Sequence, residues 1–198
     1  MAHTKAHSLF TDFDINLFKG GKHYRLYEKF GSHITEVDGE EGTYFAVWAP
    51  SAKNVSVVGD FNFWIEGEHQ LNVRWDGSGI WEGFIPGVGK GNLYKYKIQS
   101  HHNDITVEKA DPFARRCEHP PKTASVVWSD EYQWEDSKWM KNRKKKNALD
   151  APFSVYEVHL GSWKQISEEN RFLSYREMAD DLVDYVADMN FTHVEFMP

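Results

Sequence analysis

Aromatic side chains gather in a segment that leaves a predicted strand, and they offer the clearest chemistry in the chain. Phe61, Phe63 and Trp64 follow closely after Gly59-Asp60. Sugars present apolar C–H faces between hydroxyls, and a flat ring covers such a face with few torsions to freeze. Lys95, two strands away, would donate hydrogen bonds to the hydroxyls. These residues favour carbohydrate binding; packing of the loop against the core is the alternative interpretation.

Acid–base, metal and phosphate chemistry have weaker support. Glu157 and His159 share one face of a predicted strand, but catalytic groups of parallel barrels cluster at strand ends, so a structural role is favoured. Cys117 and His119 stand two apart without any Cys-x-x-Cys pattern, which argues against zinc. Gly87–Gly91 lacks the Gly-Lys-Ser/Thr ending and precedes a strand, so it predicts a hairpin turn. We expect no metal and no cofactor.

Composition excludes several classes of partner. The 198 residues carry a net charge of -7, which opposes nucleic acid as a partner. The one dense basic run, Lys138–Lys146, is interpreted as a solvated linker. A mean hydropathy of -0.64 without a long apolar run predicts no membrane span. The single cysteine, Cys117, allows no internal disulfide, and the first residues lack the apolar core of a secretory signal, so we expect a cytoplasmic protein.

Short segments separated by Gly, Pro and Asp turns predict an antiparallel, immunoglobulin-like β-sandwich. Alternation places Tyr94, Tyr96 and Ile98 on a buried face and leaves the intervening lysines on a wet face. Trp81 lies within a strand, a position that indicates core packing. Leu26–Phe30 is expected to form a short helix. The predicted strands are Thr43–Trp48, Asn54–Val58, Ile80–Ile85 and Leu93–Ile98.

In the last part of the chain, apolar residues also recur at helical spacing and not only with the alternation of strands. A buried strand at Ser154–Leu160 precedes a capping box at Ser174–Glu177, and Thr192–Met197 forms a second strand. Between them an apolar stripe recurs at helical spacing, and Asn190 is a plausible left-handed terminator. Strand, helix and strand predict one parallel βαβ unit, which requires further elements to cover its faces. The stripe consists of Met178, Leu182, Tyr185, Val186 and Met189.

Longer motifs resemble two known families. One set is similar to the family-48 carbohydrate-binding module: Tyr44–Pro50, Val57–Asn62 with Trp64, Gly79–Glu82 and Tyr94–Tyr96. A second set resembles the bacterial 1,4-α-glucan (glycogen) branching enzymes: Lys109–Phe113, Ala124–Trp128, Tyr156–Trp163 and Phe191–Pro198. The resemblance covers the chain from about residue 20 onward, and its most specific part is the block Glu157–Trp163.

The resemblance implies a glucan-handling module in front of a (β/α)8 barrel of the α-amylase superfamily, glycoside hydrolase family 13. It also implies a retaining transfer, in which an Asp nucleophile takes an α-1,4 chain, a Glu acts as acid and base, and a 6-hydroxyl accepts the chain. In the family these residues follow barrel strands 4, 5 and 7. The chain reaches strand 2, so no catalytic residue transfers to it, and we expect it to be inactive alone.

Within the module, the resemblance assigns sugar stacking to Trp64 and hydroxyl binding to Lys95. The implied partner is α-1,4-glucan, as glycogen or maltooligosaccharide. Related modules have a second stacking Trp in the loop after the Lys-bearing strand. That loop, Ser100–Asp104, contains no Trp.

We therefore predict a lead segment at 1–30, the module at 31–116, a connecting segment at 117–150 and the start of a barrel at 151–198. The remainder of that barrel would be a further partner. Two alternatives stay open: a stand-alone glycogen-binding module, and part of a sister enzyme such as a debranching enzyme or trehalohydrolase. The strands after residue 150 argue against the first, and the Glu157–Trp163 block favours branching over the second.

Overall fold

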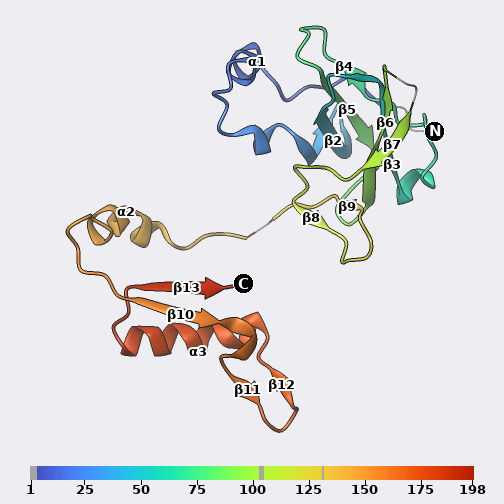
Figure 1. Cartoon of the computed structure of the whole chain (residues 1–198). Coiled ribbons are helices and arrows are strands. Elements are labelled where there is room, and N and C mark those ends of the chain that lie inside the picture. The colour runs from blue at the N-terminus through green and yellow to red at the C-terminus, as the bar shows by residue number, and fades with distance from the viewer. Residues whose placement is uncertain (1–3, 103–104, 131) are drawn as a thin grey trace. The chain divides into compact units, whose positions relative to one another are not determined.

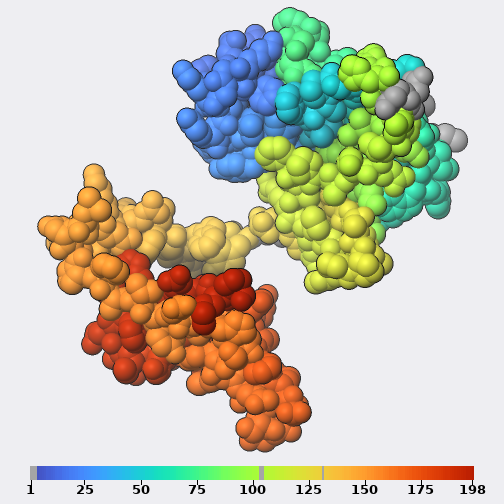
Figure 2. All heavy atoms as spheres, viewed as in Figure 1, coloured from blue at the N-terminus to red at the C-terminus, as the bar shows by residue number. Residues whose placement is uncertain are grey.

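The computed structural model describes residues 4–102, 105–130 and 132–198. The chain divides into two compact units, Met1–Glu131 and Tyr132–Pro198. Figures 1 and 2 show the first unit in blue to yellow and the second in orange to red. Within the described residues, no helix is both long and apolar enough to cross a lipid bilayer.

The first unit contains a four-stranded antiparallel sheet, here called sheet A. Its order is β1-β2-β5-β4. A two-residue turn joins the first pair, with Asp38 at φ 54° and Gly39 at φ 79°, and consecutive positive φ values suit a tight hairpin. The strands are β1 (Gly31–Val37), β2 (Glu40–Trp48), β4 (Asn72–Val73) and β5 (Ile80–Pro86).

A second antiparallel sheet, sheet B, has the order β3-β6-β9-β8, and β7 also pairs with β6. Within it Val58 lies opposite Lys95, and Gly59 lies opposite Tyr94. Its strands are β3 (Ala52–Gly59), β6 (Leu93–Ser100), β7 (Thr106–Lys109), β8 (Arg116–Cys117) and β9 (Ser125–Val126). The two antiparallel sheets confirm the mainly β prediction, and the four predicted strands are present.

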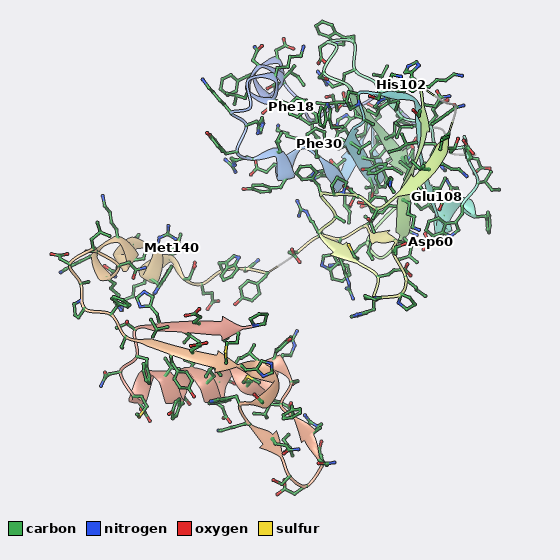
Figure 3. The ribbon with its side chains drawn as sticks, in the orientation of Figure 1. Phe18, Phe30, Asp60, His102, Glu108 and Met140 are labelled. Atoms are coloured by element: carbon green, nitrogen blue, oxygen red, sulfur yellow. The ribbon has the colours of Figure 1, made fainter. Side chains whose placement is uncertain are left out.

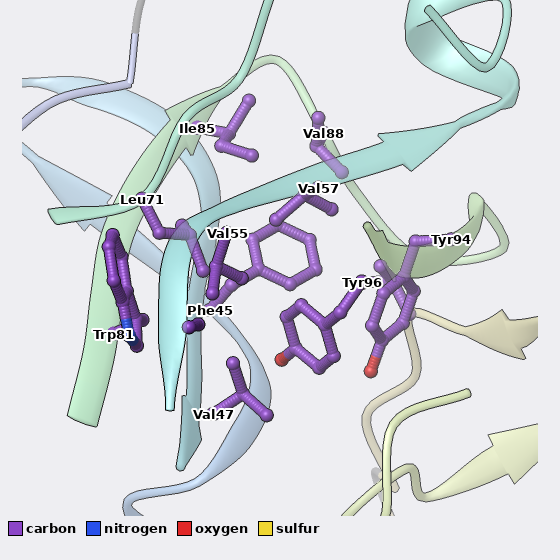
Figure 4. Close-up of a cluster of buried hydrophobic side chains, with 12 residues drawn as sticks. Phe45, Val47, Val55, Val57, Leu71, Trp81, Ile85, Val88, Tyr94 and Tyr96 are labelled. Carbon is purple, nitrogen blue, oxygen red and sulfur yellow. The ribbon is translucent and has the colours of Figure 1, made fainter. Parts of the chain in front are cut away.

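One apolar cluster joins the two sheets, as Figure 4 shows. Phe45 of β2 and Trp81 of β5 belong to it, together with Tyr94 and Tyr96 of β6. Tyr94 and Tyr96 are fully buried, which confirms the predicted alternation along β6. The core position predicted for Trp81 is also confirmed, and its indole N–H donates to the Ala49 carbonyl at 3.1 Å.

Residues before β1 pack on sheet A through a second apolar cluster. Sequence reasoning expected one short helix at Leu26–Phe30, and the structure has a 3-10 helix, η1 (Leu26–Glu28), at that place. An additional helix, α1 (Asp12–Lys19), is capped by Thr11, whose hydroxyl accepts from the Asp14 amide at 3.2 Å. The rings of Phe18 and Phe30, labelled in Figure 3, have centroids 5.6 Å apart. The lead segment is therefore a packed part of the first unit.

The second unit contains the predicted strand, helix and strand, but in the first strand, which was predicted to be buried, only Val158 is buried. Val155 of β10 (Val155–His159) lies opposite His193 of β13 (His193–Met197) in parallel pairing, with α3 (Tyr175–Asp188) between them in the chain. Val158 packs with Met178 and Leu182 of the helix. Ser174 accepts from the Glu177 amide in the predicted capping box, and Asn190 has the predicted left-handed φ of 57°. Tyr185 and Met189 of the stripe are more exposed.

Four further elements of the second unit were not predicted. The basic run, interpreted as a solvated linker, forms a helix, α2 (Ser137–Lys146), and its residues are exposed. Lys and Arg have good helix propensity, which explains helix formation without burial. A small hairpin of β11 (Gln165–Ile166) and β12 (Arg171–Phe172) follows η3 (Leu160–Ser162).

Candidate functional site

A buried asparagine holds the loop that leaves β3. Gly59 leads into a 3-10 turn, η2 (Asp60–Asn62), and Asn62 is only 1% exposed. The Asn62 Oδ1 accepts from the Gly59 amide at 2.8 Å, and its Nδ2 donates to the Val57 carbonyl at 2.9 Å. The same Nδ2 lies 2.9 Å from Nδ1 of His69. These contacts fix the turn from inside the protein.

Two further features tie the turn to β6. Asp60, labelled in Figure 3, accepts from the Leu93 amide at 3.1 Å and from Asn92 Nδ2 at 3.0 Å. A Cβ on Gly59 would lie 2.1 Å from the Leu93 carbonyl oxygen, so only glycine allows this approach of the two strands. The start of the aromatic loop, the segment that carries Phe63 and Trp64, is therefore fixed against β6, the strand that bears Lys95.

The next two residues adopt left-handed backbone conformations. Phe63 has φ 54° and Trp64 has φ 61°, which for bulky side chains costs about 1–2 kcal/mol each. The Trp64 amide donates to the Gly59 carbonyl at 2.8 Å, which closes the loop. Phe63 is 84% exposed, and Trp64 is half-buried. The locked turn thus holds a strained pair of aromatic residues at the surface.

Lys95 lies on the outer face of sheet B. Its neighbours Tyr94 and Tyr96 point into the core, so alternation directs Lys95 and Lys97 outward. Lys97 Nζ forms an ion pair with Glu66 Oε2 at 3.3 Å. Because Glu66 follows Trp64 by two residues, this ion pair shows that the aromatic loop returns over the face that carries both lysines. Among the described residues, Lys95 has neither a hydrogen bond nor an ion pair.

A buried carboxylate, which sequence reasoning missed, anchors the inner face of β6. Asp111 accepts from the hydroxyls of Tyr94 at 2.5 Å and Tyr96 at 3.2 Å. Burial raises the pKa of Asp111 above its ordinary value of 3.8, although these hydrogen bonds act in the opposite direction. The motif around Asp-Pro was the available signal, but a buried acid cannot be recognised without knowing its tyrosine partners.

Other sequence candidates do not assemble into a site. Glu157 lies beside Glu195 in the parallel register, and His159 Nδ1 is 2.8 Å from the Ser162 hydroxyl; all of these side chains are exposed. The described part of the chain contains no group of three or more His, Cys, Asp or Glu residues that could hold a metal ion. In the loop at 100–104, the last two positions lie outside the described residues.

Comparisons with known proteins identify relatives of this chain. Residues 29–114 match the family model of carbohydrate-binding module 48 (isoamylase N-terminal domain). The chain is 54% identical to the 1,4-alpha-glucan branching enzyme GlgB of Aquifex aeolicus over 98% of its own length and 31% of that protein. It is also 54% identical to GlgB of Albidiferax ferrireducens, over 95% of the chain and 29% of the relative. The chain thus spans about a third of these curated relatives.

Solved structures share the fold at lower identity. Klebsiella pneumoniae pullulanase complexed with maltotriose superposes with a TM-score of 0.60 at 21% identity, over 86% of this chain and 17% of that one. The catalytic module of the glycogen-degrading pneumococcal virulence factor SpuA gives a TM-score of 0.58 at 20% identity, over 93% and 28% of the two chains. The chain therefore matches the N-terminal region of 1,4-alpha-glucan branching enzymes and contains a carbohydrate-binding module 48 domain at residues 29–114.

Proposed function

We propose that this chain is the N-terminal part of a branching enzyme and that its sandwich binds α-1,4-glucan chains through Trp64 and Lys95. The parent would form α-1,6 branches in glycogen by retaining chain transfer, without a metal or organic cofactor, in the cytoplasm. In this proposal the sandwich positions the glucan chain, and catalytic residues come from parts of the enzyme outside these 198 residues.

The single observation that supports this role is the construction of the Trp64 loop. Asn62 and Gly59 hold an aromatic pair at the surface despite its unfavourable backbone conformation. Strain that is maintained by buried contacts is typical of ligand sites. Among the described residues, Lys95 has no partner, so its ammonium can donate to sugar hydroxyls, while the indole of Trp64 covers an apolar sugar face.

The domain organisation is part of the same proposal. We assign a lead segment to 1–30, an immunoglobulin-like module to 31–116, a connecting segment to 117–150 and the start of a (β/α)8 barrel to 151–198. The parallel pair β10 and β13 with its intervening helix supports the last assignment. The alternative of a debranching enzyme has less support, because the likeness to pullulanase is only 21% identical. A stand-alone module has less support, because it would not need the parallel strand pair after residue 150.

Calorimetric titration with maltoheptaose tests the proposal. We expect saturable heat with the unchanged chain, at least tenfold weaker binding with Trp64→Ala, and a smaller loss with Lys95→Gln, which removes the charge but keeps a donor. Trp134→Ala is the matched control, because this exposed tryptophan lies in the second unit. Equal affinity of Trp64→Ala and Trp134→Ala would overturn the assignment of Trp64.

A further inference from the structure

A second aromatic platform projects from the loop that joins β4 to β5. Trp75 is 86% exposed, although the side chains on either side of it are almost completely covered: Arg74 is 7% exposed and Asp76 is 9% exposed. The indole of Trp75 thus projects into solvent from a backbone that is fixed on both sides by its covered neighbours.

The loop is fixed by a network of charged hydrogen bonds. Asp76 accepts from Arg74 Nε at 2.7 Å and from the Ser78 amide at 2.9 Å. Lys19 of α1 donates to the Asp76 carbonyl at 2.5 Å. Arg74 also donates to Glu82 of β5 at 2.6 Å. The backbone that carries Trp75 is therefore pre-organised, and binding would order little of the chain beyond the indole itself.

A groove of about 440 Å³ lies beside this ring, within the size range of small-ligand sites. The N-terminal segment forms the other wall of the groove. This segment pairs with the same edge of β5 as β4 does, through two backbone hydrogen bonds between Lys5 and Phe84 at 2.7 and 2.9 Å. This pairing brings His7 to the groove, where Asn72 of β4 also lies.

The groove offers polar side chains, and the two charged residues that line it, Arg74 and Glu82, form an ion pair with each other. His7 packs edge-on against Tyr44 with ring centroids 5.8 Å apart, and within the described chain its ring nitrogens make no hydrogen bond. The side chain of Asn72 likewise has no partner there. Glu82 forms an ion pair with Arg74, whose guanidinium also pairs with Asp76, and it accepts from the Tyr44 hydroxyl at 2.6 Å. This combination suits a neutral, polyhydroxylated ligand better than an ion.

We infer that Trp75, His7 and Asn72 form a second glucan-binding site, in which Trp75 stacks on a sugar face while the imidazole and the amide hydrogen-bond its hydroxyls. Its ligand class rests on the proposed function. The site lies at the β4 edge of sheet A, whereas Lys95 lies on sheet B and Trp64 lies in the loop that leaves β3 of that sheet. Two sites on one module would hold a long chain more tightly than either alone, because the second contact becomes intramolecular.

Titration of the 198-residue chain with maltoheptaose, followed through its indole N–H resonances, tests the inference. Trp75→Phe identifies the Trp75 signal while keeping a ring. We expect that signal to shift saturably in the unchanged chain and in Trp64→Ala, with calorimetry giving two ligands per unchanged chain and one per Trp64→Ala chain. Trp75→Ala should weaken this second site about tenfold, and His7→Ala should weaken it two- to fivefold. Cellohexaose, with β-1,4 links, is the control ligand.

The outcomes separate this site from the one proposed at Trp64. A Trp75 signal that stays unmoved at concentrations saturating Trp64 overturns the inference and leaves the proposed function intact. Movement of Trp75 without Trp64 supports the inference and removes Trp64 from the proposal. If neither signal moves, both proposals fail. Because Trp75 is exposed, its substitutions should leave the dispersion of the amide spectrum unchanged, which verifies folding.

Discussion

Replacing Asn62 by alanine should disable the Trp64 site without touching either proposed sugar contact. The change deletes the acceptor for the Gly59 amide and the donor to the Val57 carbonyl, both inside the protein. Trp64 and Lys95 keep their side chains. If the loop depends on this buried amide, then the aromatic pair will leave its left-handed conformation, and maltoheptaose affinity will fall at least tenfold.

The magnitude of the stability loss follows from the same contacts. Each lost hydrogen bond costs about 1 kcal/mol net, and a buried backbone group left without a partner adds to this. With two backbone groups unpaired and a small cavity formed, we expect a loss of about 3 kcal/mol. Amide hydrogen exchange at Val57, whose N–H donates to the His69 carbonyl at 2.9 Å, reports the free energy of opening in this region.

Asn54→Ala is the matched control. Asn54 also makes two side-chain hydrogen bonds, to Gln99 at 3.0 Å and to Gln70 at 2.7 Å, but it is exposed. Water replaces such bonds, so its loss should be below about 1 kcal/mol. The reasoning is refuted if Asn62→Ala exchanges as slowly as the control and binds maltoheptaose with unchanged affinity.

Three further substitutions test the sandwich. Gly59→Ala would place a Cβ 2.1 Å from a carbonyl of β6 and should prevent native folding, whereas Gly89→Ala, with no atom within 4 Å, should leave the amide spectrum native. Burial raises the pKa of Asp111, so the folded protein binds this proton more tightly than the unfolded chain does. The free energy of unfolding should therefore fall as the pH rises above 3.8 through the raised pKa. Asp111→Asn should remove this pH dependence in urea titrations. Glu82→Gln removes one of the two carboxylates that pair with Arg74 and should cost about 2 kcal/mol, because Asp76 still compensates the guanidinium. The exposed Glu41→Gln should leave the melting temperature within two or three degrees.

The four strongest strands could be predicted because their alternation reflects burial on one face. The alternation of Tyr94 and Tyr96 with Lys95 and Lys97 correctly predicted which face of β6 is buried. The capping box at Ser174 gave the start of α3, because that signal is local. β1 could not be found in this way, since its hydrophobic pattern is weak and it is a strand by virtue of pairing with β2.

The site was only partly accessible from the sequence. Trp64 and Lys95 were singled out as residue types that suit a sugar, and their roles remain predictions. Asn62 belongs to the motif Val57–Asn62, but its role in holding the loop could not be predicted, because an asparagine in a turn is ordinary until its burial is known. The Trp75 platform was missed for a similar reason: its distinguishing feature is the covered network beneath it.

The tight turn between β1 and β2 has a consequence for how the sandwich folds. Hairpins form within microseconds, and a turn with two positive φ values sets the register before distant strands meet. β2 contributes to both apolar clusters, through Phe45 and Ala46, so the early hairpin offers a template on which β5 and then sheet B can assemble. Substitution of Gly39 should accordingly slow folding more than it speeds unfolding. If it mainly speeds unfolding, the folding nucleus lies outside this hairpin.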